Sequence, residues 1–273
     1  MADTPSWDPR WGGMGPPRAQ PVRQFVKRSI AFLSALGRSP SNPARGAAVL
    51  AYHTTETDPS HPWWLDFAGQ MALIEDLGHR VVPLDDVARA VRQGAPAGEP
   101  MLAITFDDGW ASNLAGAFPE LARRGWPATV FVATSYLDRR PYLMSSELPR
   151  ILEMGVALGN HTHTHRDLTG LSDPDIASEL GECSRRIEDL TGVRPSHFCY
   201  PNGRYSPRAR SAVARAGISA ACSGRVGQNP PGTDPLVLRR LTLEAGDGPR
   251  QLRWRLAGGY DFLDRRQRRM DRD

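Results

Sequence analysis

The feature that most limits the fold is a regular alternation of short apolar segments with helical segments along the chain. The apolar segments are four to eight residues long, as expected for buried strands. Between them, apolar residues recur at spacings of three and four, as on one face of an amphipathic helix. The expected strands are 47–52, 80–84, 101–106, 128–133, 156–159, 197–200, 218–222 and 236–243, and the expected helices are 65–77, 84–93, 114–124, 147–154, 172–192 and 207–216. Strands and helices in this order predict a parallel sheet, and a length of 273 residues favours an α/β barrel over an open sheet.

Two adjacent carboxylates follow the strand expected at 101–106. Asp107 and Asp108 stand where the chain leaves the sheet, and Gly109 then permits a turn that residues with a β-carbon resist. The carboxyl ends of parallel strands form the ligand-binding edge of α/β folds. Neighbouring carboxylates repel each other, and a bound cation relieves the repulsion. The pair by itself also suits a turn with a helix-capping aspartate, so this segment leaves both interpretations open.

Three histidines follow the strand expected at 156–159. His161, His163 and His165 occupy alternate positions directly after Asn160. Imidazole nitrogens and carboxylate oxygens are common zinc ligands, and two histidines with one aspartate leave positions open for water, as catalytic sites do. Together with the two carboxylates at another strand end, this cluster predicts a metal centre.

These two segments resemble the motifs of a known family, the polysaccharide deacetylases of carbohydrate esterase family 4, also called the NodB-homology domain. Thr105-Phe106-Asp107-Asp108-Gly109 is similar to its first motif, and His161-Thr162-His163-Thr164-His165 is similar to its second, His-Ser/Thr-x-x-His. The resemblance runs from Val49 to Leu243. It implies an α/β fold, a distorted (β/α) barrel of about seven parallel strands. It also implies a hydrolase acting on the carbon–nitrogen amide bond of N-acetylated sugars.

The resemblance also implies roles for individual residues. Asp108, His161 and His165 would hold the metal, which is usually zinc in this family, with other divalent transition metals as alternatives. Asp107 would be the general base that takes a proton from metal-bound water as it attacks the acetamide. The third motif corresponds to Phe198-Cys199-Tyr200-Pro201-Asn202-Gly203, where the backbone N–H of Asn202 would stabilise the oxyanion. The middle histidine of the second motif would point away from the metal.

Two positions depart from the family pattern. The third motif often carries an arginine that pairs with the base, and Arg240 is the candidate replacement because Cys199 and Asn202 stand in that motif here. The late Leu-x-Ile-x-x-His motif, which supplies the general acid, is missing, since no histidine follows His197. His53 is the candidate acid, because the same Tyr-His pair occurs in the branch resembling bacterial poly-N-acetylglucosamine deacetylases. A strand-end packing role is the alternative for His53.

Composition and charge divide the chain into three parts. Residues 1–45 are expected to form a disordered or amphipathic leader with a helix at 22–36, residues 46–263 the catalytic domain, and residues 264–273 a basic tail. The net charge of +4 is mild, with cations concentrated in both terminal parts. These cations could contact a membrane surface, unless the termini are simply solvated, and no nucleic-acid partner is expected. The oligomeric state does not follow from the sequence.

The cysteines and the apolar segments bear on the compartment. Cys183, Cys199 and Cys222 are an odd number without CxxC spacing, which fits a reducing compartment, with one disulfide and one free thiol as the alternative. No apolar run reaches the roughly 18 residues of a transmembrane helix. The segment 30–36 is a poor signal-peptide core because it lies behind a long leader. We therefore expect a cytoplasmic or membrane-peripheral protein, with the cell envelope as the alternative.

The sequence predicts a metal-dependent hydrolase that removes N-linked acetyl groups from amino sugars of a glycan or glycoconjugate. Two alternatives stay open: a hydrolase of a small cyclic amide or a formamide, and a glycan-binding pseudoenzyme that keeps the metal. The missing late histidine favours the pseudoenzyme, whereas the intact Asp107 opposes it because a binding module needs no base. Trp63, Trp64 and Trp110 are candidate platforms for sugar rings. Neither the glycan nor its linkage follows from the sequence.

Overall fold

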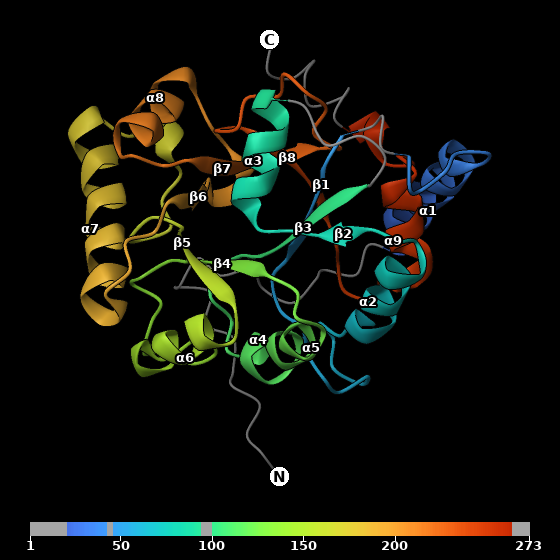
Figure 1. Ribbon diagram of the computed structural model, residues 1–273, viewed down its shortest axis with the longest axis horizontal. Coiled ribbons are helices and arrows are strands. Elements are labelled where there is room, and N and C mark those ends of the chain that lie inside the picture. The colour runs from blue at the N-terminus through green and yellow to red at the C-terminus, as the bar shows by residue number, and fades with distance from the viewer. Residues whose placement is uncertain (1–20, 43–45, 94–99, 264–273) are drawn as a thin grey trace.

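Seven parallel strands close into a barrel in the computed structural model, which describes residues 21–42, 46–93 and 100–263, with side chains from Lys27 onward (Figure 1). The ring runs β1 (Ala48–Tyr52), β3 (Met101–Phe106), β4 (Ala128–Val132), β5 (Val156–Asn160), β6 (His197–Cys199), β7 (Ala220–Val226) and β8 (Leu238–Thr242), and β8 pairs with β1. A short strand, β2 (Arg80–Val81), pairs with the start of β3 outside the ring. The predicted distorted (β/α) barrel is confirmed.

Helices surround the barrel. They are α1 (Pro21–Ala35), α2 (Phe67–Asp76), α3 (Leu84–Gln93), α4 (Ser112–Ala115), α5 (Ala117–Arg124), α6 (Leu148–Glu153), α7 (Asp173–Thr191), α8 (Pro207–Arg215) and α9 (Pro249–Leu256). In Figure 1, α7 and α8 lie on one side of the barrel, whereas α1, α2 and α9 lie on the other. The helix α7 has the boundaries that the sequence predicts, because Ser172 caps its start and Gly192 ends it in the left-handed conformation.

The helix α3 closes the amino end of the barrel. Side chains alternate along each strand, so Leu50 faces the outer helices, whereas Val49 joins an inner cluster with the apolar face of α3. At the start of β6, His197 Nε2 lies 3.1 Å from Asp85 Oδ1 of α3. Arg92 of α3 donates to the carbonyl of Ser219 just before β7. With this end covered, the carboxyl end of the barrel is the one available for a site.

Several elements differ from the sequence-based expectation, and β7 extends to Val226, four residues beyond the strand expected at 218–222. The strand expected at 80–84 ends at Val81, because Leu84 already begins α3 and Pro83 has no N–H to donate to a sheet. The helix expected at 114–124 is divided at Gly116, where a Cβ would lie 2.4 Å from the carbonyl oxygen of Thr55. The helix α9 was not expected, because its apolar residues (Leu252, Trp254, Leu256) alternate as they would in a strand.

The expectations for the terminal parts are met only where the structure describes them. The helix expected at 22–36 is present as α1, whereas the predicted disorder of 1–20 and the predicted basic tail at 264–273 lie outside the described residues. Cys183, Cys199 and Cys222 are buried free thiols. Within the described ranges, none of the helices is both long and apolar enough to span a bilayer.

Candidate metal centre and active site

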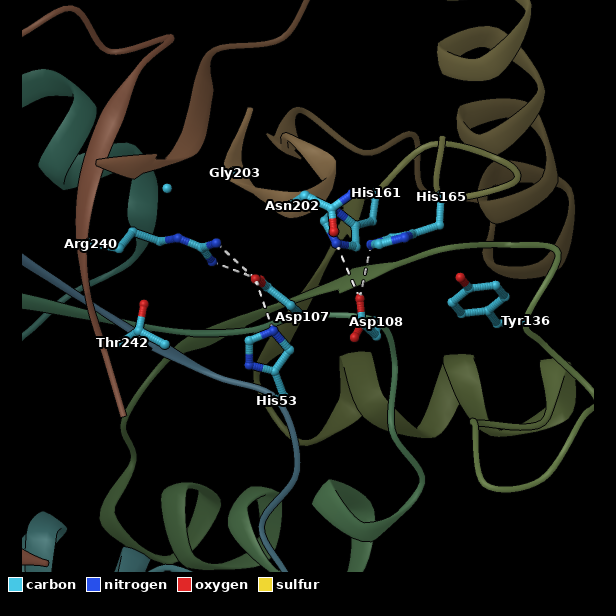
Figure 2. Close-up of a pocket in the computed structure, with 11 residues that line it drawn as sticks. His53, Asp107, Asp108, Tyr136, His161, His165, Asn202, Gly203, Arg240 and Thr242 are labelled. Atoms are coloured by element: carbon cyan, nitrogen blue, oxygen red, sulfur yellow. Dashed lines mark hydrogen bonds and ion pairs between the residues drawn. The ribbon is translucent and has the colours of Figure 1, made fainter. Parts of the chain in front are cut away.

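A cavity of about 310 Å³ opens at the carboxyl end of the barrel. Every strand of the ring contributes to its wall, either through the strand itself or through the loop that follows it. The lining residues are His53, Asp107, Asp108, Tyr136, His161, His165, Asn202, Gly203, Gly224, Arg240 and Thr242 (Figure 2). All seven residues that the sequence singled out for metal binding or catalysis are therefore brought together in one cavity.

Asp108 and two histidines form a group with the geometry of a metal centre. Asp108 Oδ1 lies 3.3 Å from His161 Nε2 and 3.3 Å from His165 Nε2. Ligand atoms about 2.0–2.2 Å from a tetrahedral ion are separated by roughly 3.3–3.6 Å, so these distances fit such an ion. Burial opposes ionisation of Asp108, but its contacts with the two imidazoles hold its pKa well below the ordinary value. One carboxylate and two imidazoles are a donor set for a divalent transition metal.

Left-handed backbone conformations place these ligands. Asp108 has φ of 68° and His165 has φ of 60°. Thr162 and Asn202, which adjoin the same site, are also left-handed, and Asp138 is the one other non-glycine residue of this kind in the described chain. Non-glycine residues rarely adopt this conformation, and they concentrate where a site requires it. The turn at Asp108 continues through Gly109, whose φ of 76° confirms the role expected for that glycine.

The helix α7 holds the histidine loop in place. The Asn160 amide donates to the carbonyl of Leu180 and to Ser184 Oγ, and its Oδ1 accepts from the N–H of Thr162. Glu179, which is buried, accepts from the N–H and the hydroxyl of Thr164. These hydrogen bonds fix the turn at Asn160 and at Thr164, on either side of its centre, so they hold the loop in place where the metal would bind.

Further contacts orient the ligand side chains. His161 Nδ1 lies 2.7 Å from the carbonyl oxygen of Cys199, which requires Nδ1 to carry the proton and leaves Nε2 free for a metal. Trp110 Nε1 donates to Asp108 Oδ2 at 3.3 Å, so Oδ1 is the oxygen that faces the histidines. His161 and Asp108 thus each present one defined atom to the centre.

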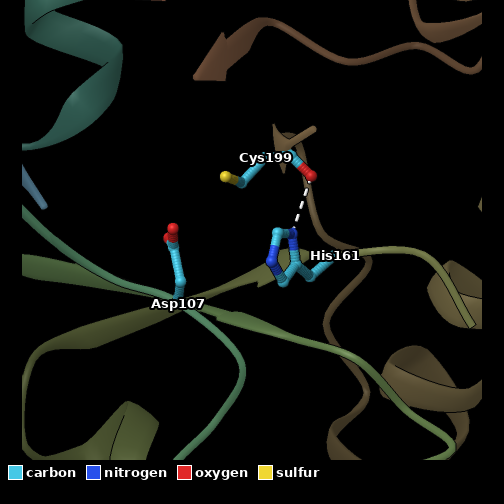
Figure 3. Close-up of side chains that lie close together, drawn as sticks. All are labelled: Asp107, His161 and Cys199. Atoms are coloured by element: carbon cyan, nitrogen blue, oxygen red, sulfur yellow. Dashed lines mark hydrogen bonds between the residues drawn. The ribbon is translucent and has the colours of Figure 1, made fainter. Parts of the chain in front are cut away.

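A second group, formed by Asp107, His161 and Cys199, is a poorer candidate for a metal (Figure 3). Burial raises the pKa of the Cys199 thiol well above its ordinary value, although Arg240 partly opposes this. A protonated thiol is a weak ligand. Both carboxylate oxygens of Asp107 already accept from Arg240, so this aspartate is engaged elsewhere.

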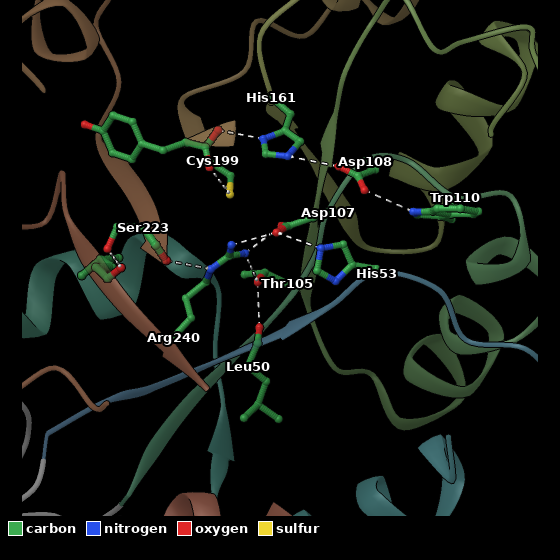
Figure 4. A network of polar contacts seen from close by, with 12 residues as sticks. Leu50, His53, Thr105, Asp107, Asp108, Trp110, His161, Cys199, Ser223 and Arg240 are labelled. Carbon is green, nitrogen blue, oxygen red and sulfur yellow. Dashed lines mark hydrogen bonds and ion pairs between the residues drawn. The ribbon is translucent and has the colours of Figure 1, made fainter. Parts of the chain in front are cut away.

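Asp107 and Arg240 form a buried ion pair. Arg240 Nη1 and Nη2 donate to the two oxygens of Asp107, each at 2.7 Å. Arg240 is held by further contacts with the carbonyl of Ser223 and the hydroxyl of Thr105 (Figure 4). Burial would raise the pKa of Asp107, but the adjacent guanidinium outweighs it and holds that pKa below its ordinary value. Asp107 is therefore an anion at neutral pH.

His53 approaches Asp107 from the loop after β1. Its Nε2 lies 3.9 Å from Asp107 Oδ2, and its side chain is 23% exposed to solvent. The carbonyl of His53 accepts from the Asn113 side chain, which also accepts from Thr55, so α4 fixes this loop. Figure 2 shows that the two aspartates have different partners. Asp107 contacts Arg240 and His53, whereas Asp108 contacts the two ligand histidines.

The third motif presents a free backbone donor. Asn202 is left-handed, with φ of 56°, and its N–H has no hydrogen-bond partner among the residues that the structure describes. The next residue, Gly203, packs so closely on β7 that a Cβ there would lie 2.3 Å from the Cα of Gly224. This close approach of two backbones holds Asn202 at the cavity wall.

Residues 94–221 match the family model described as Polysaccharide deacetylase. Over these residues the chain is similar to the polysaccharide deacetylase family. The matched segment contains both aspartates and the histidine loop. His53 and Arg240, which the sequence assigned without a family motif, lie outside it.

Known proteins of this type are similar to the chain. YxkH of Bacillus subtilis is 23% identical over 199 residues, which are 72% of this chain and 71% of YxkH. The chitooligosaccharide deacetylase of Sinorhizobium fredii is 32% identical over 141 residues, which are 50% of this chain and 62% of that protein. The structure of IcaB from Ammonifex degensii has a TM-score of 0.70 at 21% identity and covers 79% of this chain and 97% of its own. The structural likeness shows the shared deacetylase fold.

Sequence reasoning missed Tyr136, which lines the cavity from the loop after β4. Its ring centroid lies 5.7 Å from that of His165 and 4.6 Å from that of Tyr142. Burial, together with the negative charge of Asp108, raises the pKa of Tyr136 to about 12, so it keeps its proton. Its hydroxyl finds no partner in the described part of the chain. No local signal marks this tyrosine, because its neighbours in sequence carry no motif.

The remaining candidates lie outside the cavity lining. His163 Nδ1 is 2.9 Å from the hydroxyl of Thr134, which fits the expectation that this histidine points away from the metal. Trp110 donates to Asp108 and packs on Tyr142, and Trp63 packs on Trp110. The role of Trp63, Trp64 and Trp110 as platforms for sugar rings stays a prediction.

Proposed function

We propose that the protein is a zinc-dependent hydrolase that removes the N-acetyl group from an amino sugar of a glycan or glycoconjugate. The observation that carries the proposal is the separation of tasks between two adjacent aspartates. Asp108 faces two histidines, whereas Asp107 is an ionised carboxylate held by Arg240. The match of residues 94–221 to the polysaccharide deacetylase family model supports this reaction, as does the likeness to a chitooligosaccharide deacetylase.

Asp108, His161 and His165 would hold the zinc ion through Oδ1 and the two Nε2 atoms. A divalent ion at this position supplies Lewis-acid chemistry: it polarises a carbonyl oxygen and lowers the pKa of water. Cys199 and Trp110 keep His161 and Asp108 oriented, so that these two donors need little rearrangement on binding.

Asp107 would be the general base. The two guanidinium hydrogen bonds keep it ionised and fix the plane of its carboxylate, and each oxygen retains a lone pair that can accept a proton from the attacking water. Arg240 would therefore act through Asp107 as a positioning residue. A binding module would have no use for a buried anion with this arrangement.

His53 and Asn202 would complete the reaction. The N–H of Asn202 would donate to the oxyanion that forms when water attacks the acetamide carbonyl. His53 would give a proton to the nitrogen of the sugar as the carbon–nitrogen bond breaks, which releases acetate and a free amine. Its partial exposure and its place beside Asp107 support this assignment.

Acetate release from N-acetylglucosamine oligomers by the zinc-loaded protein tests the proposal. Asp107→Asn should lower kcat by about a hundredfold or more while the bound zinc is unchanged, because Asp107 is not a ligand. His53→Gln should also lower kcat without loss of metal. Full activity of Asp107→Asn would refute the assignment of the base.

The same assay separates the alternatives. Metal-loaded protein that binds oligomers and releases no acetate would point to the pseudoenzyme. If the protein hydrolyses only a cyclic amide or a formamide in a panel of substrates, that compound class and not a glycan is the substrate.

A further inference from the structure

Two charged residues of α1, Lys27 and Arg28, contact the body of the protein. Lys27 Nζ lies 2.8 Å from Glu244 Oε1, and Arg28 Nη2 lies 3.0 Å from the buried Asp247 Oδ1. Ala31 and Ala35 are buried on the same side, and the carbonyl of Ala31 approaches Gly259 so closely that a Cβ there would lie 2.3 Å away. The helix is therefore tied to the body of the protein through ion pairs and small residues.

The opposite face of α1 is apolar and exposed. Ile30 is 41% exposed, Phe32 45%, Leu33 64% and Leu36 57%. At 100° per residue, Ile30 and Leu33 lie on the side of the helix that faces away from the two buried alanines, and Phe32 lies at the edge of that side, beside Trp254 of α9. Leu36 follows the last residue of the helix, Ala35. We call these four residues the outer patch of α1. Among the described residues, only Val193 is another large hydrophobic side chain with comparable exposure, at 49%. A surface helix normally buries its apolar face, and a cluster of exposed apolar side chains on such a helix is typical of an interaction site.

Exposed arginines stand near the outer patch. Arg38 comes two residues after Leu36, and Arg253 precedes Trp254 of α9, whose ring centroid is 5.6 Å from that of Phe32. Arg250 is also exposed, and its guanidinium carbon lies 5.9 Å from the Trp254 ring. None of these three arginines forms an ion pair with a carboxylate of the described chain. An apolar face rimmed by unpaired cations is complementary to an anionic lipid surface.

We propose that the outer patch of α1 inserts into the interfacial layer of an anionic phospholipid membrane and holds the enzyme on its surface. The helix would lie in the plane of the membrane, because its other face is fixed to α9 and to the segment that carries Glu244 and Asp247. The arginines would contact lipid phosphates at the rim. This inference is independent of the reaction proposed above, because it uses none of the residues of the cavity.

Co-sedimentation of the full chain with vesicles tests the proposal. One set of vesicles contains phosphatidylcholine alone, and the other contains about one third phosphatidylglycerol. We expect binding to the anionic set, and Leu33→Gln with Leu36→Gln should weaken it at least about tenfold. Val193→Gln is the control, since it removes a hydrophobic side chain that is 49% exposed and lies outside the patch, and its binding should equal that of the wild type. Arg38→Gln with Arg253→Gln should weaken binding to the anionic vesicles and reduce its dependence on salt.

Three results would overturn the proposal. Wild-type protein that stays in solution with both vesicle types refutes it, and so does a double leucine variant that binds as the wild type does. A wild-type dimer in sedimentation velocity that the leucine substitutions convert to a monomer, without any vesicle binding, assigns the patch to a second copy of the chain. Thermal melts of each variant show whether it is folded. Acetate release from soluble oligomers should be the same in the double variant, so a failure here is distinct from a failure of the proposed reaction.

Discussion

Replacing Arg240 with methionine should destabilise the protein much more than removing an exposed arginine with similar contacts. The side chains of Arg240 and Asp107 are 7% and 5% exposed, and two hydrogen bonds of 2.7 Å join them. Methionine fills similar volume but leaves the Asp107 carboxylate buried without its counter-charge. Breaking a buried pair in this way costs about 3–5 kcal/mol of unfolding free energy.

An arginine on α7 provides the matched control. Two nitrogens of Arg185 contact the carboxylate of Glu182, at 2.7 and 3.3 Å, and a third contacts that of Asp189 at 2.5 Å. The side chains of Arg185, Glu182 and Asp189 are 59%, 39% and 58% exposed, so solvent screens these pairs and Arg185→Met should cost much less stability than Arg240→Met. The difference between the two variants isolates the effect of burial.

Urea unfolding of the chelator-treated protein, followed by circular dichroism, measures both free energies. In thermal unfolding of the same samples, Arg240→Met should lower the midpoint temperature Tm by about 10 °C. Adding Asp107→Leu to Arg240→Met should restore most of the lost stability, because the unpaired charge is then gone. If Arg240→Met costs no more than Arg185→Met, or if the second substitution restores nothing, the buried carboxylate is not the source of the cost and the reasoning is wrong.

Three further predictions concern the metal, the substrate and acid stability. Chelation should abolish acetate release, and added zinc should restore it. Asp108→Asn should weaken metal binding at least about a hundredfold. Cys199→Ser should leave the metal content unchanged, because the buried thiol is protonated and is not a ligand. Tyr136→Phe should lower kcat/KM about 2- to 10-fold without loss of metal, if its unpartnered hydroxyl donates to the substrate. The contact with His197 holds the pKa of Asp85 at about 2, below its ordinary 3.8, so this pair stabilises the fold fully above about pH 4 and loses its effect as the pH falls toward 2. The difference in urea midpoint between wild type and Asp85→Asn should therefore shrink over that range, and a constant difference would contradict the assignment.

The sequence by itself determined the parts of the site that depend on neighbouring residues. The run from Met101 to Phe106 is apolar enough to form a buried strand wherever it pairs, and Asp107 and Asp108 must then emerge at its carboxyl end. The spacing of His161 and His165 likewise follows from one loop. The boundaries of α7 were predictable because its capping residues lie next to it in the chain.

Only the tertiary structure decided the contacts between distant segments. Arg240 meets Asp107 across 133 positions of sequence, because β8 returns to pair with β1 and closes the barrel. Tyr136 belongs to the site because the loop after β4 passes beside His165, which no local pattern reveals.

The helix α1 shows the same limit. Periodicity predicts its amphipathic character, but ion pairs with Glu244 and Asp247, more than 200 residues away, decide which face points outward. Local propensity and spacing are properties of adjacent residues, whereas the orientation of a face and the partner of a buried charge are set by the closure of the whole fold.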